Sequence, residues 1–243
     1  MKLVNNRIRL IALLIGFLFL VSCTTAADSI PTSVKEMLSS VDWDLSELRC
    51  SDVSDLTLFQ QHTRYYLVSG SADEVWNSYK STDFSVGWRG PIGRFGALYD
   101  PYSDILYTPG KGPVPGIRTG QIVFLDLLIE AFLHITAAFQ ISDIDDDLHI
   151  IEFTYLEQNV SQGRQEIRVF PVQSDGKFRT LVRHRTWYRS GSNIRDRLFY
   201  APYHTQTIDE YHFRIAMKND LLLTAVTEKM MKKRGLIPSD QPL

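Results

Sequence analysis

Cysteine, net basic charge and long hydrophobic runs are all scarce in this sequence, and each shortage excludes a class of protein. The 243 residues hold 2 cysteines, so a disulfide framework of the kind found in small secreted domains is excluded. The 26 basic residues are outnumbered by 28 acidic ones, which gives a formal charge of −2. Because a general nucleic-acid binder needs a basic surface, we expect no nucleic-acid partner.

Metal-binding and nucleophile motifs are missing as well. No two of the 6 histidines have His-x-x-x-His spacing, and no Gly-x-Ser-x-Gly elbow occurs. Residues 143–147 begin like a calcium loop, but Leu148 replaces the required glycine, so a turn is expected. Asp209 and His212 lie one helical turn apart and could share a proton or a metal, although a surface pair is the favoured interpretation. The sequence predicts no metal site and no cofactor.

One hydrophobic run stands out, Leu10–Val21, and it follows a basic N-terminal stretch. The run is shorter than the roughly 20 residues that a membrane-spanning helix needs, so the pattern is typical of an export signal. It ends in Leu20-Val-Ser-Cys23, which resembles the lipobox of bacterial lipoproteins. The resemblance implies cleavage of a signal peptide over 1–22, lipidation of Cys23 and a lipidated tether over 23–31.

The lipid anchor implied by this resemblance also predicts partner and location. The chain would contact a membrane through its N-terminal lipid. In a Gram-negative host, Thr24 in place of aspartate after the cysteine implies the outer membrane, facing the periplasm. An ordinary signal peptide cut near Ala26 and Ala27, or an uncleaved anchor, is the alternative. Cys50 then has no partner cysteine, and we expect it to pack as a small apolar residue.

Two capping boxes mark helices in the N-terminal third. Ser33-Val-Lys-Glu36 predicts a short helix within a helical and loop lead-in over 32–60. Ser71-Ala-Asp-Glu74 predicts a second helix over 72–80, directly after a tyrosine-rich strand over 62–68.

The remainder of the chain changes from irregular to β and then to helical patterns. Residues 84–120 hold much of the glycine and proline and predict turns and coil around one short strand at 105–107. Apolar residues at helical spacing predict a long amphipathic helix over 205–233. Between these segments the pattern predicts strands over 121–129, 135–142, 149–157, 165–172 and 178–189.

These elements predict an α+β fold in which a curved antiparallel sheet of about six to seven strands wraps around a long C-terminal helix, the helix-grip arrangement. Val68–Trp76 resembles the first strand and helix start of START-like proteins, the polyketide cyclase and lipid-transfer superfamily. Phe153–Tyr155 and Gly163–Glu166 resemble uncharacterised bacterial domains of that superfamily. The resemblance implies one domain over 61–235, followed by a tail over 236–243. A lipocalin-like barrel is the alternative.

Strand alternation over 178–189 separates two faces. Its arginines share one face, which we expect to meet solvent, where Glu166 can pair with Arg183 or Arg185. The opposite face, together with the inward positions of neighbouring elements, predicts either a mostly apolar ligand pocket or a plain core. The residues predicted to contact a ligand are Phe153, Tyr155, Ile167, Val169, Val182, His184, Tyr188, Tyr211 and Ile215.

Three functions follow as hypotheses. The first is a membrane-anchored lipoprotein that binds a hydrophobic or amphipathic small molecule, lipid included, between the sheet and the helix. The second is a cyclase- or hydrolase-like enzyme that uses His184 with Tyr155 or Tyr188 as acid and base groups. The third is a non-catalytic envelope or assembly component that presents 84–120 as a binding surface.

Overall fold

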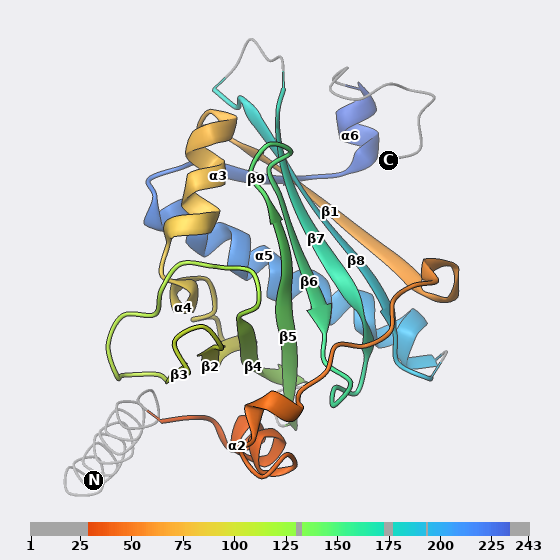
Figure 1. The fold of residues 1–243 in the computed structure, drawn as a ribbon. Helices are drawn as coiled ribbons and strands as arrows, with labels where there is room; N and C mark the ends of the chain where they lie inside the picture. The colour runs from red at the N-terminus through yellow and green to blue at the C-terminus, as the bar shows by residue number, and fades with distance from the viewer. Residues whose placement is uncertain (1–28, 130–132, 173–176, 193, 234–243) are drawn as a thin grey trace, which may run out of the picture.

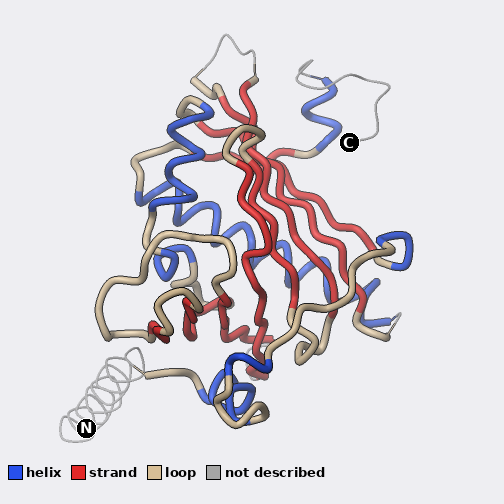
Figure 2. The backbone as a smooth tube through the Cα atoms, viewed as in Figure 1, coloured by secondary structure: helices blue, strands red, loops and turns tan. Residues whose placement is uncertain are grey.

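The computed structural model describes residues 29–129, 133–172, 177–192 and 194–233. Within these ranges, nine strands form one curved antiparallel sheet in the order β3-β2-β4-β5-β6-β7-β8-β1-β9 (Figures 1 and 2). The predicted α+β fold with a sheet around a C-terminal helix is confirmed, with more strands than the six to seven expected. The strands are β1 (Gln60–Val68), β2 (Gly93–Asp100), β3 (Ile105–Tyr107), β4 (Ile122–Ile129), β5 (Leu133–Asp145), β6 (Ile150–Tyr155), β7 (Gln162–Pro171), β8 (Thr180–Arg189) and β9 (Leu223–Val226).

The helix that the sheet grips is α5 (Ala201–Lys218), which runs behind the strands in Figure 1. Its buried apolar positions are Ile208, Tyr211, Ile215 and Ala216, and Tyr211 and Ile215 join the main hydrophobic core. That core also takes inward side chains of β1, β4, β5, β6, β7 and β8. The apolar residues that recur at helical spacing in the sequence therefore lie on one face of α5, and this face packs against the sheet.

The prediction of one helix over 205–233 is wrong beyond residue 218. Asn219 ends α5, Asp220 takes a positive φ of 55°, and the chain then forms β9, which pairs with β1. A second, short helix follows, α6 (Glu228–Lys233). Asn and Asp are turn formers that tolerate this left-handed conformation, and the unpaired edge of β1 offers main-chain partners to the residues that follow.

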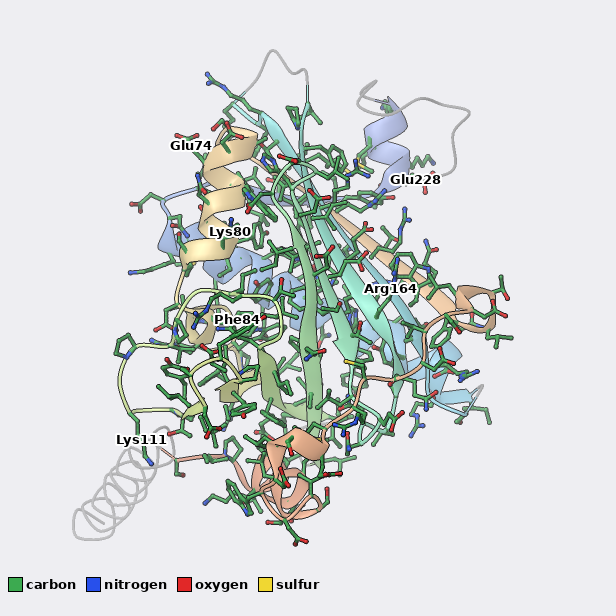
Figure 3. All side chains as sticks on the ribbon, viewed as in Figure 1. Glu74, Lys80, Phe84, Lys111, Arg164 and Glu228 are labelled. Atoms are coloured by element: carbon green, nitrogen blue, oxygen red, sulfur yellow. The ribbon has the colours of Figure 1, made fainter. Side chains whose placement is uncertain are left out.

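The helix predicted after β1 is confirmed as α3 (Ala72–Ser81). The Ser71 hydroxyl accepts from the Glu74 N–H, and the Glu74 carboxylate accepts from the Ser71 N–H, so both halves of the capping box are present (Glu74 is labelled in Figure 3). The next helix, α4 (Phe84–Gly87), brings Phe84 and Trp88 against Tyr211 of α5. These aromatic rings close one end of the space between sheet and helix.

The lead-in segment packs on the outer, convex face of the sheet. Val34 and Leu38 of α2 (Thr32–Ser39) are fully buried against a second apolar cluster that includes Phe124. The predicted capping box at Ser33 is wrong, because Pro31 precedes the helix and the Ser33 hydroxyl donates to Asp126 on β4 instead. Two short 3₁₀ helices, η1 (Leu45–Glu47) and η2 (Leu56–Leu58), complete the lead-in.

Close packing of α2 depends on a glycine in β2. A Cβ added to Gly96 would lie 2.6 Å from Cγ2 of Val34 and 2.9 Å from the carbonyl oxygen of Phe124. The register of β2 on β4 shifts at this residue, which is a β-bulge, and a second bulge occurs in β5 after Ile141. Bulges increase the local twist and bend the strand, which helps the sheet to curve around α5.

Cys50 is half-buried and packs against the apolar cluster of Val34, Leu38 and Phe124. Its thiol lies 3.2 Å from Oε1 of Gln140. The predicted signal peptide over 1–22, Cys23 and the predicted tail over 236–243 lie outside the described residues. Within the described ranges, none of the helices is both long enough and apolar enough to cross a membrane.

Candidate functional site

A cavity of about 340 Å³ lies between the N-terminal half of α5 and the concave face of β4 and β5. Its walls are mostly apolar, and the side chains that form them include Leu125, Leu127, Ile135, Ala137, Phe139 and Ile208. Leu133 and Val160 also line it and are 50% and 54% exposed, so the cavity reaches the surface at their edge.

Polar groups gather at one part of this lining. Gln165 of β7 donates from Nε2 to the hydroxyl of Tyr155 on β6 over 2.5 Å. The Tyr155 hydroxyl lies 2.7 Å from that of Tyr200, which ends a π-helical turn over Arg195–Tyr200, just before α5. All three residues line the cavity, as do Arg195 and His204. Tyr155, Gln165 and Tyr200 therefore form a connected polar end to an otherwise apolar space.

The polar end continues into the core through two histidines. Oε1 of Gln165 lies 2.7 Å from Nε2 of His184, and Nδ1 of His184 lies 2.8 Å from Nε2 of His212. Nδ1 of His212 is hydrogen-bonded to the hydroxyl of Tyr79 on α3. Together with Tyr155 and Tyr200, these side chains make a continuous chain of six, which we call the relay.

Burial fixes the charge of the relay. It lowers the pKa of His212 to about 3 and that of His184 well below its ordinary value, with smaller contributions from neighbouring positive and imidazole groups. It also raises the pKa of Tyr155 to about 12 and that of Tyr200 well above its ordinary value. Each member is thus neutral at pH 7 and acts through hydrogen bonds.

Of the nine residues predicted to contact a ligand, the structure places Tyr155 in the lining of this cavity. His184 lies behind the lining as a member of the relay, and both of its ring nitrogens are engaged there. Tyr188 stacks on Tyr200 at 3.7 Å between ring centroids and donates to the carbonyl of Asp196. The remaining six are packed in the main core beside the cavity: Phe153, Ile167, Val169, Val182, Tyr211 and Ile215.

Sequence reasoning missed most of the actual lining. Gln165 lies on the inward face of β7 with Ile167 and Val169. Strand alternation over this segment was therefore sufficient to predict that Gln165 points inward. Leu125 and Leu127 lie in an apolar run whose alternation is hidden because both faces of β4 are buried. No sequence signal marks the position of Tyr200, since it depends on how the π-helical turn meets the sheet.

Two further predictions about polar pairs have opposite outcomes. Arg183 and Glu166 form the predicted cross-strand ion pair at 2.7 Å. Both interpretations of Asp209 and His212, a surface pair and a shared proton or metal, are wrong. His212 is fully buried and belongs to the relay, whereas Asp209 binds Arg64 and Tyr66. In the part of the chain that the structure describes, no cluster of three metal-ligating side chains occurs.

No family model and no curated protein sequence matches the chain. Among solved structures, the chain is similar to major latex-like protein 151 from Panax ginseng, with 11% identity, a TM-score of 0.47, and coverage of 66% of this chain and 97% of that one. Norcoclaurine synthase from Thalictrum flavum is 11% identical, with a TM-score of 0.44 and coverage of 70% of this chain and 95% of that one. A protein from Nitrosospira multiformis is 11% identical, with a TM-score of 0.42 and coverage of 70% of this chain and 99% of that one. The class of the protein is defined by its own sheet and α5: an α+β helix-grip fold with a cavity at one end of the gripped helix.

Proposed function

We propose that the protein binds an apolar small molecule in the cavity between α5 and the sheet. The observation that carries this proposal is a space of about 340 Å³ whose walls are largely aliphatic and aromatic, with a polar group of tyrosines and Gln165 at one part. Ligand sites of proteins have this composition and begin at about 300 Å³.

Binding is favoured over acid–base catalysis by the position of the candidate base. His184 does not line the cavity, and both of its ring nitrogens already have partners, Gln165 and His212. A general base must reach the proton that it removes, directly or through one water. The residues that do reach the cavity, Tyr155 and Tyr200, have raised pKa values and act as neutral hydroxyl groups.

A neutral fluorescent probe tests the proposal directly. The reference protein is the full-length chain with Cys23→Ser, so that no lipid competes for the probe. We expect N-phenyl-1-naphthylamine to bind saturably to it at one site, with increased emission. Ala137→Phe fills the cavity and weakens binding more than about tenfold, because the added ring takes the ligand's place.

The matched control places the same residue change on the surface. Ala225 is exposed on β9, and Ala225→Phe leaves probe binding unchanged. Should Ala137→Phe unfold, Val160→Trp supplies a second test, because Val160 is exposed at the edge of the cavity and a larger side chain there obstructs entry. Equal probe affinity in the reference protein and both cavity variants would refute the proposal.

We also propose that Cys23 carries a lipid that anchors the protein to a membrane. The support is the order Leu20-Val-Ser-Cys23 at the end of the apolar run. The two cysteines provide a matched pair, since Cys50 is the other one in the chain. Phase partition in Triton X-114 after expression in a Gram-negative host should show the wild type and Cys50→Ser in the detergent phase. Cys23→Ser should move to the aqueous phase, and a variant that stays in detergent would contradict the anchor.

A further inference from the structure

All hydrogen bonds of the relay donate in the same direction, from Tyr79 toward the cavity, and the bond at Tyr79 determines that direction. Tyr79 is 3% exposed, and its hydroxyl has a single hydrogen-bond partner among the described residues, Nδ1 of His212. A buried hydroxyl must donate its proton or lose a hydrogen bond, so the Tyr79 O–H donates and Nδ1 accepts. The neutral ring of His212 then carries its proton on Nε2 and donates it to Nδ1 of His184.

The same logic carries the direction outward to the cavity. His184 is neutral and accepts at Nδ1, so it donates from Nε2 to Oε1 of Gln165. The amide of Gln165 donates from Nε2 to the hydroxyl oxygen of Tyr155. Tyr155 in turn donates its proton to the hydroxyl oxygen of Tyr200. Reversal of a bond between Tyr79 and Gln165 would leave the Tyr79 proton buried without an acceptor. Reversal of the outermost bond would instead leave the proton of Tyr155, which is more buried than Tyr200, without an acceptor among the described residues.

The Tyr200 O–H is therefore the outer end of the relay. With Tyr155 donating to it, the Tyr200 hydroxyl has no other acceptor among the described residues, and Tyr200 lines the cavity. The Tyr200 oxygen already accepts from Tyr155, so what it offers to a ligand is the proton. We propose that the ligand carries a carbonyl-type hydrogen-bond acceptor, a ketone, ester or carboxylate oxygen, that binds the hydroxyl of Tyr200; this rests on the proposed function of the cavity.

Nε of Arg195 and Nε1 of Trp88 have no hydrogen-bond partner within the described part of the chain, but both atoms are buried behind the lining and do not face the cavity. Neither aspartate nor glutamate occurs among the described residues that line the cavity. The lining therefore offers the proton of Tyr200 to an acceptor, and a ligand with an ammonium group would find no acidic partner. Nδ1 of His204 and Oγ1 of Thr136 are also buried and unpaired, and since each can either donate or accept they do not decide the question.

Two ligands of the same shape distinguish the contribution of the hydrogen-bond acceptor to affinity from that of apolar burial. 2-Acetylnaphthalene has a carbonyl oxygen where 2-isopropenylnaphthalene has a CH₂ group. Both displace N-phenyl-1-naphthylamine from the reference protein if the cavity binds apolar molecules at all. We expect the ketone to bind about five- to tenfold more tightly, which is the range of one hydrogen bond.

Tyr200→Phe removes only the hydroxyl at the outer end of the relay. The ratio of ketone to hydrocarbon affinity should fall at least threefold in this variant, while the hydrocarbon affinity stays within about twofold and so shows that the site is intact. Tyr102→Phe removes a hydroxyl from a tyrosine that is 75% exposed and outside the cavity, and it keeps the reference ratio.

The outcomes distinguish this inference from the proposed function. Displacement by neither ligand would refute the cavity as a binding site. Displacement by both with equal affinity, or a ratio that survives Tyr200→Phe, would overturn the acceptor inference alone. 2-Naphthoate identifies the source of the oxygen: tighter binding than the ketone supports a carboxylate held also by Arg195, and weaker binding supports a neutral carbonyl.

Discussion

Nδ1 of His184 lies 2.8 Å from Nε2 of His212, and the two rings are 2% and 0% exposed. At this separation one ring nitrogen donates and the other accepts, so the two rings are not both protonated. Burial supports the same state, because it disfavours the charged form of each ring. The pair joins β8 to α5 through a polar contact inside an apolar core, and it makes the stability of the fold depend on pH.

Acidification should destabilise the protein. The pKa of His212 falls from 6.5 to about 3 on folding, so the unfolded state binds more protons at intermediate pH and stability is lost as pH falls below 6.5. His212 alone predicts a loss of about 2 kcal/mol between pH 7.5 and pH 5, and His184 adds in the same direction. Urea unfolding at both pH values measures this change. A flat profile, or one as steep in His212→Gln as in the reference protein, would contradict it.

Gln165→Leu should destabilise the fold by about 2 kcal/mol or more. The change leaves the buried Nε2–H of His184 without an acceptor and removes the donor to Tyr155. Gln162→Leu on the same strand is the control, because Gln162 accepts from Arg189 in a half-buried contact, and its loss should cost less than about 1 kcal/mol. Equal losses in chemical unfolding of the two variants would show that the relay adds nothing beyond an ordinary contact.

Gly163→Ala should cost about 3 kcal/mol or more. Gly163 has a φ of 147°, and a Cβ there would lie 1.9 Å from the carbonyl oxygen of Trp187, so β7 and β8 would have to separate. Gly112→Ala controls for the backbone conformation, since Gly112 has a φ of 113° and no atom within 4 Å of an added Cβ. Thermal unfolding should separate the two by several degrees. Similar melting temperatures would mean that conformation alone, and not the close approach, sets the cost.

Short-range signals predicted the local structure well. The spacing of Ser71 and Glu74 was sufficient to place α3, because a capping box involves only residues within one turn. Alternation placed His184 inward and Arg183 beside Glu166, because side chains of a strand point alternately to its two faces. The end of α5 was not predicted, since the competing pairing of β9 with β1 joins residues far apart in the sequence.

Local sequence patterns could not predict where the cavity lies, because its location depends on contacts between elements that are far apart in the sequence. The predicted site lay along β6, β7 and β8, but aromatic side chains from α3 and α4 fill the space between that part of the sheet and the C-terminal half of α5. Phe84 and Trp88 belong to the segment that the sequence predicted as coil. Because they occupy that end, the open space lies instead at the N-terminal half of α5, against β4 and β5.

Contacts between a bound ligand and methyl groups test the central claim most directly. In the reference protein with 2-acetylnaphthalene bound, intermolecular nuclear Overhauser effects should connect the ring protons of the ligand to the methyl groups of Leu125, Leu127 and Ile208, which line the cavity. They should be absent for Leu38 and Leu181, which are buried in the two other apolar clusters. Contacts to these last two methyl groups, or none to the lining, would contradict a ligand site between α5 and the sheet.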